Sequence, residues 1–167
     1  MKNREIMKLI KKAKSRDPDA FTELMQFYLK DMYHDAIAIL MNDEDAADAI
    51  QETLLICWEK LGTLKENKYF KTWMIRILIN NCYSIRNKKK TFADLENVAE
   101  LFQNDEYNLE IKEMLSMLDE KYRVPVMMFY IQGYKISEIS QILEIPQSTI
   151  QTRLARAREK LRDLYEK

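Results

Sequence analysis

Hydrophobic residues recur at steps of three and four along the first part of the chain, the period of an amphipathic α-helix. Asp17 and Pro18 mark a helix start, with Asp17 as the candidate N-cap and Pro18 at the first helical position. The hydrophobic stripe that follows consists of Phe21, Leu24, Tyr28, Met32, Ala36 and Ile39. The pattern therefore predicts a long helix that ends near Leu40.

Two further helices are predicted before residue 91. The second follows Asn42 or Asp43, either of which can cap it, and Gly62 is expected to end it. Its buried stripe consists of Ala46, Ile50, Thr53, Leu54, Cys57 and Leu61. Residues 63–69 have the composition of a loop, and a third helix is expected from about Phe70 to the basic run at residues 88–90.

The helical period is lost in residues 91–107, which are acidic with scattered apolar positions, and we interpret them as a flexible linker. The alternative is one short helix that contains Phe92, Leu95, Val98 and Leu101. The helical period returns at Leu109 and continues, with a break at Gly133, to Tyr165. The expected fold class is all-α, with two small helical domains at residues 1–90 and 108–167 joined by the acidic linker. Within the second domain, residues 136–165 predict a helix-turn-helix.

Composition narrows the possible functions. Only 2 Gly and 3 Pro occur in 167 residues, which argues against turn-rich β folds and glycine-rich phosphate loops. Two cysteines and a single histidine, His34, offer no disulfide framework, metal site or catalytic constellation, and we expect His34 to be a partly exposed structural residue. We therefore expect no enzyme activity, no cofactor and no metal. Without an uncharged run near the ~20 residues that cross a bilayer, no membrane insertion is expected either, and a cytoplasmic location follows.

The balanced total of 27 basic and 27 acidic residues hides strong segregation along the chain. Residues 1–16, 65–90 and 147–162 are basic, whereas residues 42–60 and 91–120 are acidic. Alternating blocks of this kind suggest a polyanion for the basic faces and a different partner for the acidic ones. Any one block taken alone also fits a solvated helix face, and residues 1–16 could form either a helix or a disordered basic arm.

The predicted helix-turn-helix carries the most specific chemistry. Pro146 stops its first helix, and the second presents side chains that suit a DNA major groove, where Arg reads guanine, Gln reads adenine and hydroxyls bind phosphates. These side chains are Gln147, Ser148, Thr149, Gln151, Thr152, Arg153 and Arg156. Ser140 and Glu144 depart from the usual pattern of this motif, in which Ala and Gly are common. The alternative is an ordinary helical hairpin with a basic face.

The third helix has an aromatic, basic and amide stripe opposite its apolar side. Such a stripe suits single-stranded nucleic acid, because rings stack on bases and cations hold phosphates. Its members are Trp73, Arg76, Asn80, Tyr83, Asn87 and Lys90, and the preceding loop adds Lys65, Asn67, Lys68 and Tyr69. Trp73 could equally be a core residue.

The second helix shows the reverse pattern, with acids beside exposed apolar residues, which is typical of a protein interface. The face consists of Asp48, Gln51, Glu52, Leu55 and Glu59. Trp58 could join this face beside Leu55 or pack against the first long helix, and of the two we favour packing against the helix.

The three patterns together resemble a known family. Domain two of bacterial sigma factors resembles AFTELMQFYLKDMYHDAIAILMNDEDAADAIQETLLICWEKL in its polymerase-binding part and YFKTWMIRILINNCYSIRNKKK in its promoter-melting part. Domain four, which reads the minus-thirty-five element, is similar to GYKISEISQILEIPQSTIQTRLARAREKLRDLY. A chain with only these two domains and a short linker resembles the extracytoplasmic-function (ECF) group of the sigma-seventy superfamily.

The resemblance implies a function and its sites. Asp48, Gln51, Glu52 and Leu55 would contact the β′ clamp helices of core RNA polymerase, and domain four would meet its β flap. The minus-ten bases of the melted non-template strand would be captured by Asn67, Lys68, Tyr69, Trp73, Arg76 and Asn80. The seven helix-turn-helix side chains named above would dock in the duplex minus-thirty-five element. An anti-sigma factor commonly holds members of this family inactive.

Two other functions remain open from the residues themselves. A stand-alone helix-turn-helix regulator would bind duplex DNA without polymerase, but it gives the Trp73 stripe and the acidic face no role. A helical adaptor for proteins would leave the basic faces merely solvated and would show no steep salt dependence of DNA binding.

Overall fold

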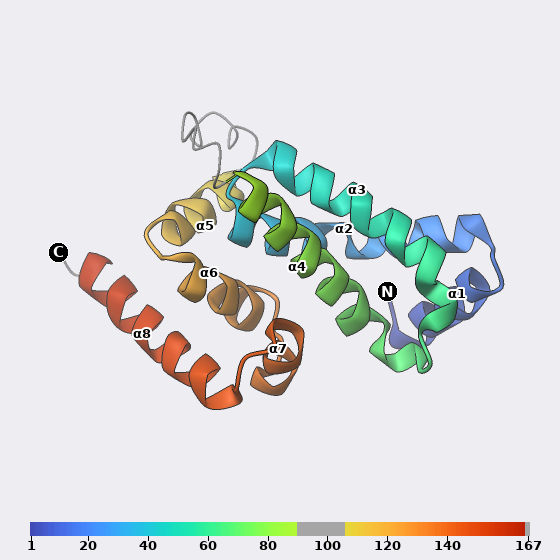
Figure 1. Ribbon diagram of the computed structural model, residues 1–167. Coiled ribbons are helices and arrows are strands. Elements are labelled where there is room, and N and C mark those ends of the chain that lie inside the picture. Colours follow the sequence, from blue (N-terminus) through green and yellow to red (C-terminus); the bar gives the residue numbers. More distant parts are fainter. Residues whose placement is uncertain (90–105, 166–167) are drawn as a thin grey trace.

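The computed structural model describes residues 1–89 and 106–165, and these are almost entirely helical, with no strand among them (Figure 1). The helices are α1 (Asn3–Lys14), α2 (Pro18–Leu40), α3 (Asp43–Lys60), α4 (Phe70–Lys89), α5 (Glu106–Ser116), α6 (Glu120–Val126), α7 (Ile136–Leu143) and α8 (Gln147–Tyr165). Short 3-10 turns occupy Leu61–Thr63 and Asn67–Tyr69. The all-α prediction is confirmed. The predicted linker lies mostly outside the described residues.

The predicted helix starts are confirmed by their caps. The Asp17 carboxylate accepts from the backbone N–H groups of Asp19 and Ala20, and Pro18 stands at the first helical position. Asn42, rather than Asp43, caps α3 by accepting from the Asp45 N–H at 2.9 Å. α3 ends at Lys60, two residues before Gly62, but Gly62 lies within the 3-10 turn that follows and has no positive φ, so it does not act as a left-handed glycine cap.

The first half of the chain builds its core from α2, α3 and α4, which lie side by side in Figure 1. Leu24 and Met32 of α2 are fully buried with Cys57 of α3 and Leu78 of α4. The basic N-terminus is a helix, which settles the alternative left open above: Ile10 and Ala13 of α1 are buried against this core, whereas Lys8, Lys11 and Lys12 are exposed. His34 is buried, 8% exposed, and not partly exposed as expected.

The second half pairs α6 and α7 with the long C-terminal helix α8. α6 contains Pro125, which lacks an N–H, and the chain continues from it as a π-helical segment, Met127–Ile131. Gly133 then breaks the helix with a φ of 75°, in the left-handed region that glycine adopts readily. Ile139 of α7 and Ile150 and Leu154 of α8 are buried in the core of the helix-turn-helix.

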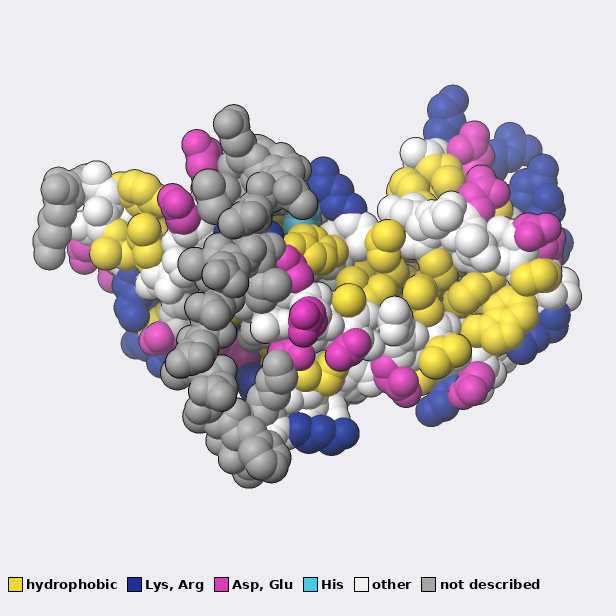
Figure 2. Space-filling model, turned by 90° about the horizontal axis from the view of Figure 1, so that it is seen from above, with side chains coloured by type: hydrophobic (Ala, Val, Ile, Leu, Met, Phe, Trp, Pro, Cys, Tyr) yellow, Lys and Arg dark blue, Asp and Glu magenta, His cyan; other side chains and the backbone are white. Residues whose placement is uncertain are grey.

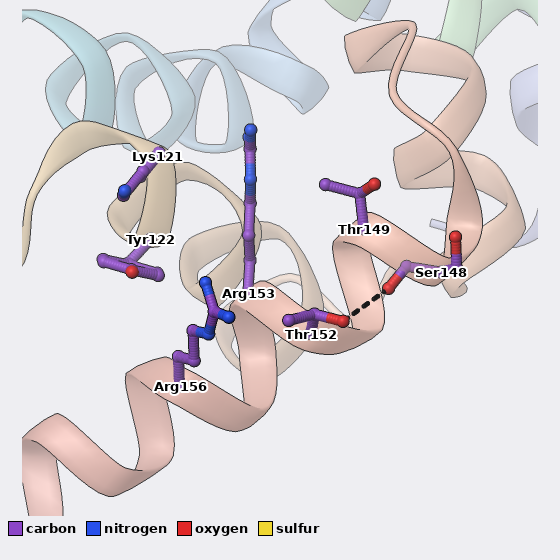
Figure 3. Close-up of a pocket in the computed structure, with 7 residues that line it drawn as sticks. All are labelled: Lys121, Tyr122, Ser148, Thr149, Thr152, Arg153 and Arg156. Atoms are coloured by element: carbon purple, nitrogen blue, oxygen red, sulfur yellow. Dashed lines mark hydrogen bonds between the residues drawn. The ribbon is translucent and has the colours of Figure 1, made fainter.

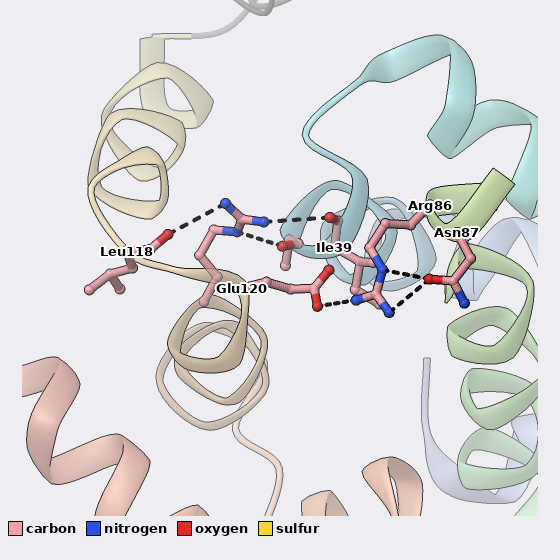
Figure 4. A network of polar contacts seen from close by, with 7 residues as sticks. Ile39, Arg86, Asn87, Leu118 and Glu120 are labelled. Atoms are coloured by element: carbon pink, nitrogen blue, oxygen red, sulfur yellow. Dashed lines mark hydrogen bonds and ion pairs between the residues drawn. The ribbon is translucent and has the colours of Figure 1, made fainter. Parts of the chain in front are cut away.

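The two halves pack against each other rather than standing apart, and one continuous hydrophobic cluster spans both. α2 lies against α6, and α4 lies against α7. Polar contacts join the same surfaces: Arg123 donates to the backbone carbonyl groups of Ala38 and Ile39, and Arg86 forms an ion pair with Glu120 (Figure 4). The linker composition fixes no angle between the domains, but these contacts do.

Candidate nucleic-acid and protein interfaces

The acidic face of α3 is exposed along its whole length. Asp48, Gln51 and Glu52 are exposed and lie one helical turn or less apart, and Leu55 continues the face with 61% of its surface accessible. Trp58 does not belong to this face. Its ring packs on Phe21 of α2 at 5.0 Å between centroids, as predicted, and the Arg16 guanidinium covers it at 4.0 Å.

An apolar groove adjoins this face. It measures about 180 Å³ and is lined by Phe21, Thr22, Met25, Gln26, Leu29 and Leu54. Figure 2 shows hydrophobic side chains gathered over this part of the molecule, with acidic side chains along their margin. Phe21 was predicted to belong to the buried stripe, and the groove was not predicted. The available signal for the groove was Leu29, an apolar residue that lies outside the buried stripe, between Tyr28 and Met32. Leu29 is 46% exposed.

The candidate minus-ten residues lie on one 3-10 turn and the helix that follows it. Asn67, Lys68 and Tyr69 form the turn, in which the Lys68 ammonium lies 5.0 Å from the centre of the Tyr69 ring. On α4, Arg76 and Asn80 are exposed. Trp73 is half-buried, so it is partly a core residue and partly a member of the exposed stripe. Its ring lies 5.9 Å from that of Phe70 between centroids, and part of its surface remains accessible.

The candidate minus-thirty-five residues converge at the start of α8. Ser148, Thr149, Thr152, Arg153 and Arg156 line one side of a pocket of about 310 Å³ (Figure 3). Gln147 and Gln151 are exposed on the same helix. Five of the seven residues predicted to act together therefore line the same pocket. Arg supplies donors for phosphates and guanine, and the hydroxyl groups of Ser and Thr can bind either phosphates or bases.

The other side of this pocket was not predicted. Lys121 and Tyr122 of α6 complete its lining, and the Lys121 ammonium lies 5.1 Å from the centre of the Tyr122 ring. No sequence pattern ties residue 121 to residue 153, because their proximity depends on how α6 packs against α8. Lys121 adds a cation to the basic end of α8, so the pocket attracts an anion from two helices.

The unusual residues of the helix-turn-helix both have structural roles. The Ser140 hydroxyl donates to the Ile145 carbonyl oxygen at 2.6 Å, which closes the turn. Glu144 ends α7 in the left-handed conformation, with a φ of 57°. Its carboxylate forms an ion pair with Arg76 of α4.

Nothing in the described residues adds reactive chemistry to these faces. Burial raises the pKa of the Cys57 thiol to about 12, and burial with nearby carboxylates also raises the pKa of Cys82, so both thiols stay protonated at neutral pH. The described part of the chain holds no group of three or more potential metal ligands. None of its helices is both long and apolar enough to span a bilayer.

Comparison with known families matches both halves. Residues 24–91 match the family Sigma-70 region 2, and residues 108–161 match Sigma-70, region 4. The ECF RNA polymerase sigma factor SigW of Bacillus subtilis is 30% identical over an alignment that covers 94% of this chain and 95% of that protein. SigM of the same organism is 28% identical, with 86% and 93% covered.

Solved structures share the fold. CnrH, in complex with the cytosolic domain of CnrY, superposes with a TM-score of 0.75 at 22% identity and covers 97% of both chains. The sigma factor RpoE of Bartonella quintana, in complex with the anti-sigma factor NepR, also has a TM-score of 0.75, at 24% identity, with 87% of this chain and 96% of that one covered.

Region 2 followed by region 4 in one helical chain defines the sigma factors of bacterial RNA polymerase. The chain belongs to their extracytoplasmic-function group. It binds core RNA polymerase and promoter DNA and directs promoter-specific initiation, as a sigma factor rather than a stand-alone regulator. Sigma factors are regulatory subunits rather than catalytic enzymes.

Proposed function

We propose that this sigma factor divides initiation between residues 1–90, which act as domain two, and residues 108–167, which act as domain four, with residues 91–107 as the linker. The proposal rests on the observation that the protein has three exposed faces, which differ in the charge and type of their side chains. One face is acidic and apolar, one is aromatic and basic, and one is a basic pocket at the start of a recognition helix.

The acidic face of α3 binds the β′ clamp helices of core polymerase. Asp48, Gln51, Glu52 and Leu55 form its centre, and the neighbouring groove at Leu29 and Leu54 extends the apolar part. Apolar anchors surrounded by charge are typical of protein interfaces, in which the anchors supply affinity and the charges supply orientation.

The turn at Asn67, Lys68 and Tyr69, together with Trp73, Arg76 and Asn80 of α4, captures the melted minus-ten bases. An exposed tyrosine, 54% accessible, and a half-buried tryptophan offer rings on which unstacked bases can lie. The adjacent cations neutralise phosphates and help to hold the strand open.

Gln147, Ser148, Thr149, Gln151, Thr152, Arg153 and Arg156 read the minus-thirty-five element in the major groove. Lys121 joins them as a phosphate contact from α6. Base contacts then supply sequence discrimination, and Lys121 supplies salt-dependent affinity and position.

A second groove in domain four suits the β flap. It measures about 470 Å³ and is lined mainly by apolar side chains, among them Met114, Val126, Tyr130 and Leu161. Tyr130 and Tyr165 beside it are 49% and 65% exposed. Exposed apolar surface of this kind marks a protein contact, and it leaves the DNA pocket at Arg153 free.

An anti-sigma factor is a further expected partner, because both structural relatives were solved with a protein partner: CnrH with the cytosolic domain of CnrY, and RpoE with the anti-sigma factor NepR. The place of action is the cytoplasm, where RNA polymerase works.

A run-off transcription assay with core RNA polymerase and a randomised promoter library tests the proposal. New start sites that share two spaced elements are the expected result. Polymerase that stays silent and does not copurify with the protein would overturn it. A tight, specific gel shift without polymerase would instead favour a regulator that acts alone.

A further inference from the structure

A hydrogen bond joins the helix assigned to polymerase binding with the helix assigned to minus-ten capture. The Asn81 side chain of α4 donates from its Nδ2 to the Thr53 hydroxyl of α3 at 3.0 Å. The same hydroxyl donates to the Ala49 carbonyl oxygen, one turn earlier in α3, at 2.7 Å. Thr53 is fully buried, and Asn81 is half-buried. The Thr53 oxygen therefore accepts from α4 while its proton is held within α3.

Both partners of this bond stand beside residues with proposed contacts to polymerase or DNA. Glu52 directly precedes Thr53 and Leu55 follows it by two positions, and both of these neighbours are exposed on the acidic face of α3. On α4, Asn81 directly follows Asn80, which is exposed. Successive residues of a helix point about 100° apart, so one asparagine can meet α3 while its neighbour faces solvent.

The apolar contact between α3 and α4 does little to fix the rotation of either helix. The two helices pack side by side (Figure 1). The residues of α3 with no accessible surface are all small, namely Ala46, Ala49, Thr53 and Cys57. Helices hold their orientation when the side-chain ridges of one fit into the grooves of the other, and small side chains form low ridges. Burial of apolar surface is also non-directional, so it brings the helices together without selecting one rotation of α4.

The hydrogen bond supplies a directional constraint at this contact. Hydrogen bonds weaken steeply away from their preferred distance and angle, and a polar side chain buried between helices can fix their register. The bond between Asn81 and Thr53 holds one side of α4 against α3. The candidate minus-ten residues Trp73, Arg76 and Asn80 lie on a different side of α4. The direction in which they point is therefore set by the same bond.

We propose that Asn81 and Thr53 are positioning residues for strand capture: their hydrogen bond fixes the rotation of α4 relative to α3, and so aims the minus-ten residues of α4 at the melted strand. The inference rests on the proposed roles of α3 and α4. Polymerase holds α3 from its exposed face, so the geometry between the two helices decides where α4 stands in the holoenzyme. Loss of the bond should impair the capture of unstacked bases and leave core binding in place.

Thr53→Val tests the proposal, because it removes the hydroxyl and keeps the shape of the side chain. Holoenzyme with this variant is expected to form closed complexes as the native protein does, but several-fold fewer open complexes, measured by permanganate reactivity of the minus-ten thymines. Its affinity for a fork-junction probe with single-stranded minus-ten bases should fall as well. Thr53→Ser keeps the hydroxyl and should behave as the native protein. Ser116→Ala, which removes an exposed hydroxyl that donates to a carbonyl oxygen within α5, is the control.

Two further measurements separate positioning from a general loss of structure. A purely structural role predicts that the unfolding temperature and copurification with core polymerase fall together with opening. Positioning predicts that Thr53→Val retains both, because the exposed face of α3 is unchanged and the half-buried Asn81 amide can bond to water instead. Asn81→Ala combined with Thr53→Val should open no fewer complexes than the weaker single variant, since both changes remove one bond.

Native levels of opening by Thr53→Val would overturn the proposal, as would equal losses of opening and core binding, or losses that add in the double variant. Trp73→Ala and Asn80→Ala on the same promoter separate this outcome from failure of the proposed function. If they impair opening and Thr53→Val does not, the minus-ten role of α4 stands and the positioning role fails. If neither impairs opening, the minus-ten role fails and the positioning role fails with it.

Discussion

Arg123 of α6 donates a hydrogen bond from its Nε to the carbonyl oxygen of Ala38 at 2.7 Å, and so ties domain four to the end of α2. The carbonyl groups in the last turn of a helix have no partner within that helix. A guanidinium placed there satisfies them and complements the negative end of the helix dipole. The same side chain also reaches the Ile39 and Leu118 carbonyl groups, so it joins three segments.

Replacement of Arg123 by Ala should therefore loosen the two halves. Hydrogen bonds that involve a charged group contribute about 1.5–3 kcal/mol, and we expect a loss of that size in the free energy of unfolding measured in urea. Lys at this position should recover only part of the loss, because an ammonium lacks the planar fork. Arg4→Ala, at an exposed position of α1, is the control. Equal stability of Arg123→Ala and the native protein would contradict the prediction.

Asp35 makes the stability of this interface depend on pH. Burial, the largest effect, raises its pKa well above the ordinary value, and Asp31 adds to the rise, whereas the Gln132 side chain and Lys71 oppose it. Neither carboxylate oxygen has a hydrogen-bond partner among the described residues, and Gln132 Oε1 also lacks one. The groups around Asp35 include Asp31 of α2, Lys71 and Cys82 of α4, and Tyr134.

The neutral acid is the form that the fold favours, so stability is fully present below the unfolded pKa of 3.8 and falls as pH rises through the folded pKa. Asp35→Asn does not titrate and should remove this fall. The unfolding temperature of the variant should exceed that of the native protein by more at pH 8 than at pH 5. Each 1 kcal/mol of difference in the free energy of unfolding corresponds to a shift of roughly 2–4 °C. Asp163→Asn, at an exposed position of α8, should show no such trend. An equal difference in unfolding temperature at both pH values would contradict the ionisation of buried Asp35 between them.

Asp48 and Glu52 should be required for binding to core polymerase. Both side chains are exposed, so their replacement by Lys leaves folding within about 0.5 kcal/mol of native. The same change places a positive charge in the acidic face, and like charges brought together at an interface cost several kcal/mol. We expect the double variant to lose copurification with core enzyme by at least about tenfold. Glu5→Lys, at an exposed position of α1 outside this face, should retain binding.

Arg153 should control recognition of the minus-thirty-five element. Its replacement by Ala is expected to weaken initiation by about 1–3 kcal/mol, the usual contribution of a good base contact, only on promoters that carry the element. Lys121→Gln offers a contrast, since loss of a phosphate contact weakens binding to all sequences and lowers the salt slope by about one. Equal activity of Arg153→Ala on promoters with and without the element would contradict the assignment.

Trp73 should act in strand opening. Trp73→Ala is expected to lower permanganate reactivity of the melted minus-ten thymines more than it lowers closed-complex formation, because a stacking platform matters only for unstacked bases. Trp73 also contacts Phe70, so its removal costs stability. Asn80→Ala, at an exposed position on the same stripe, should weaken opening without that cost. Unchanged melting in both variants would contradict a role for α4.

The sequence by itself determined the helices and the identity of their exposed faces. Asp17, Pro18 and Asn42 act on the backbone within a few residues of themselves, so their effect does not depend on the rest of the fold. The seven recognition-helix residues were predicted as a group because one helical period places them together. The end of α3 near Gly62 was also predictable, but the 3-10 turn that follows it was not, because glycine permits a left-handed cap without requiring one.

The contacts between segments far apart in the chain could not be predicted from local patterns. Lys121 joined the DNA pocket, Leu29 joined an apolar groove, and Glu144 met Arg76, in each case across elements whose packing no local pattern records. The same is true of His34, which is buried although it was expected to be partly exposed. Local spacing sets which side of a helix a residue faces. What lies opposite that side depends on contacts between residues far apart in the chain, and these form only when the whole molecule folds.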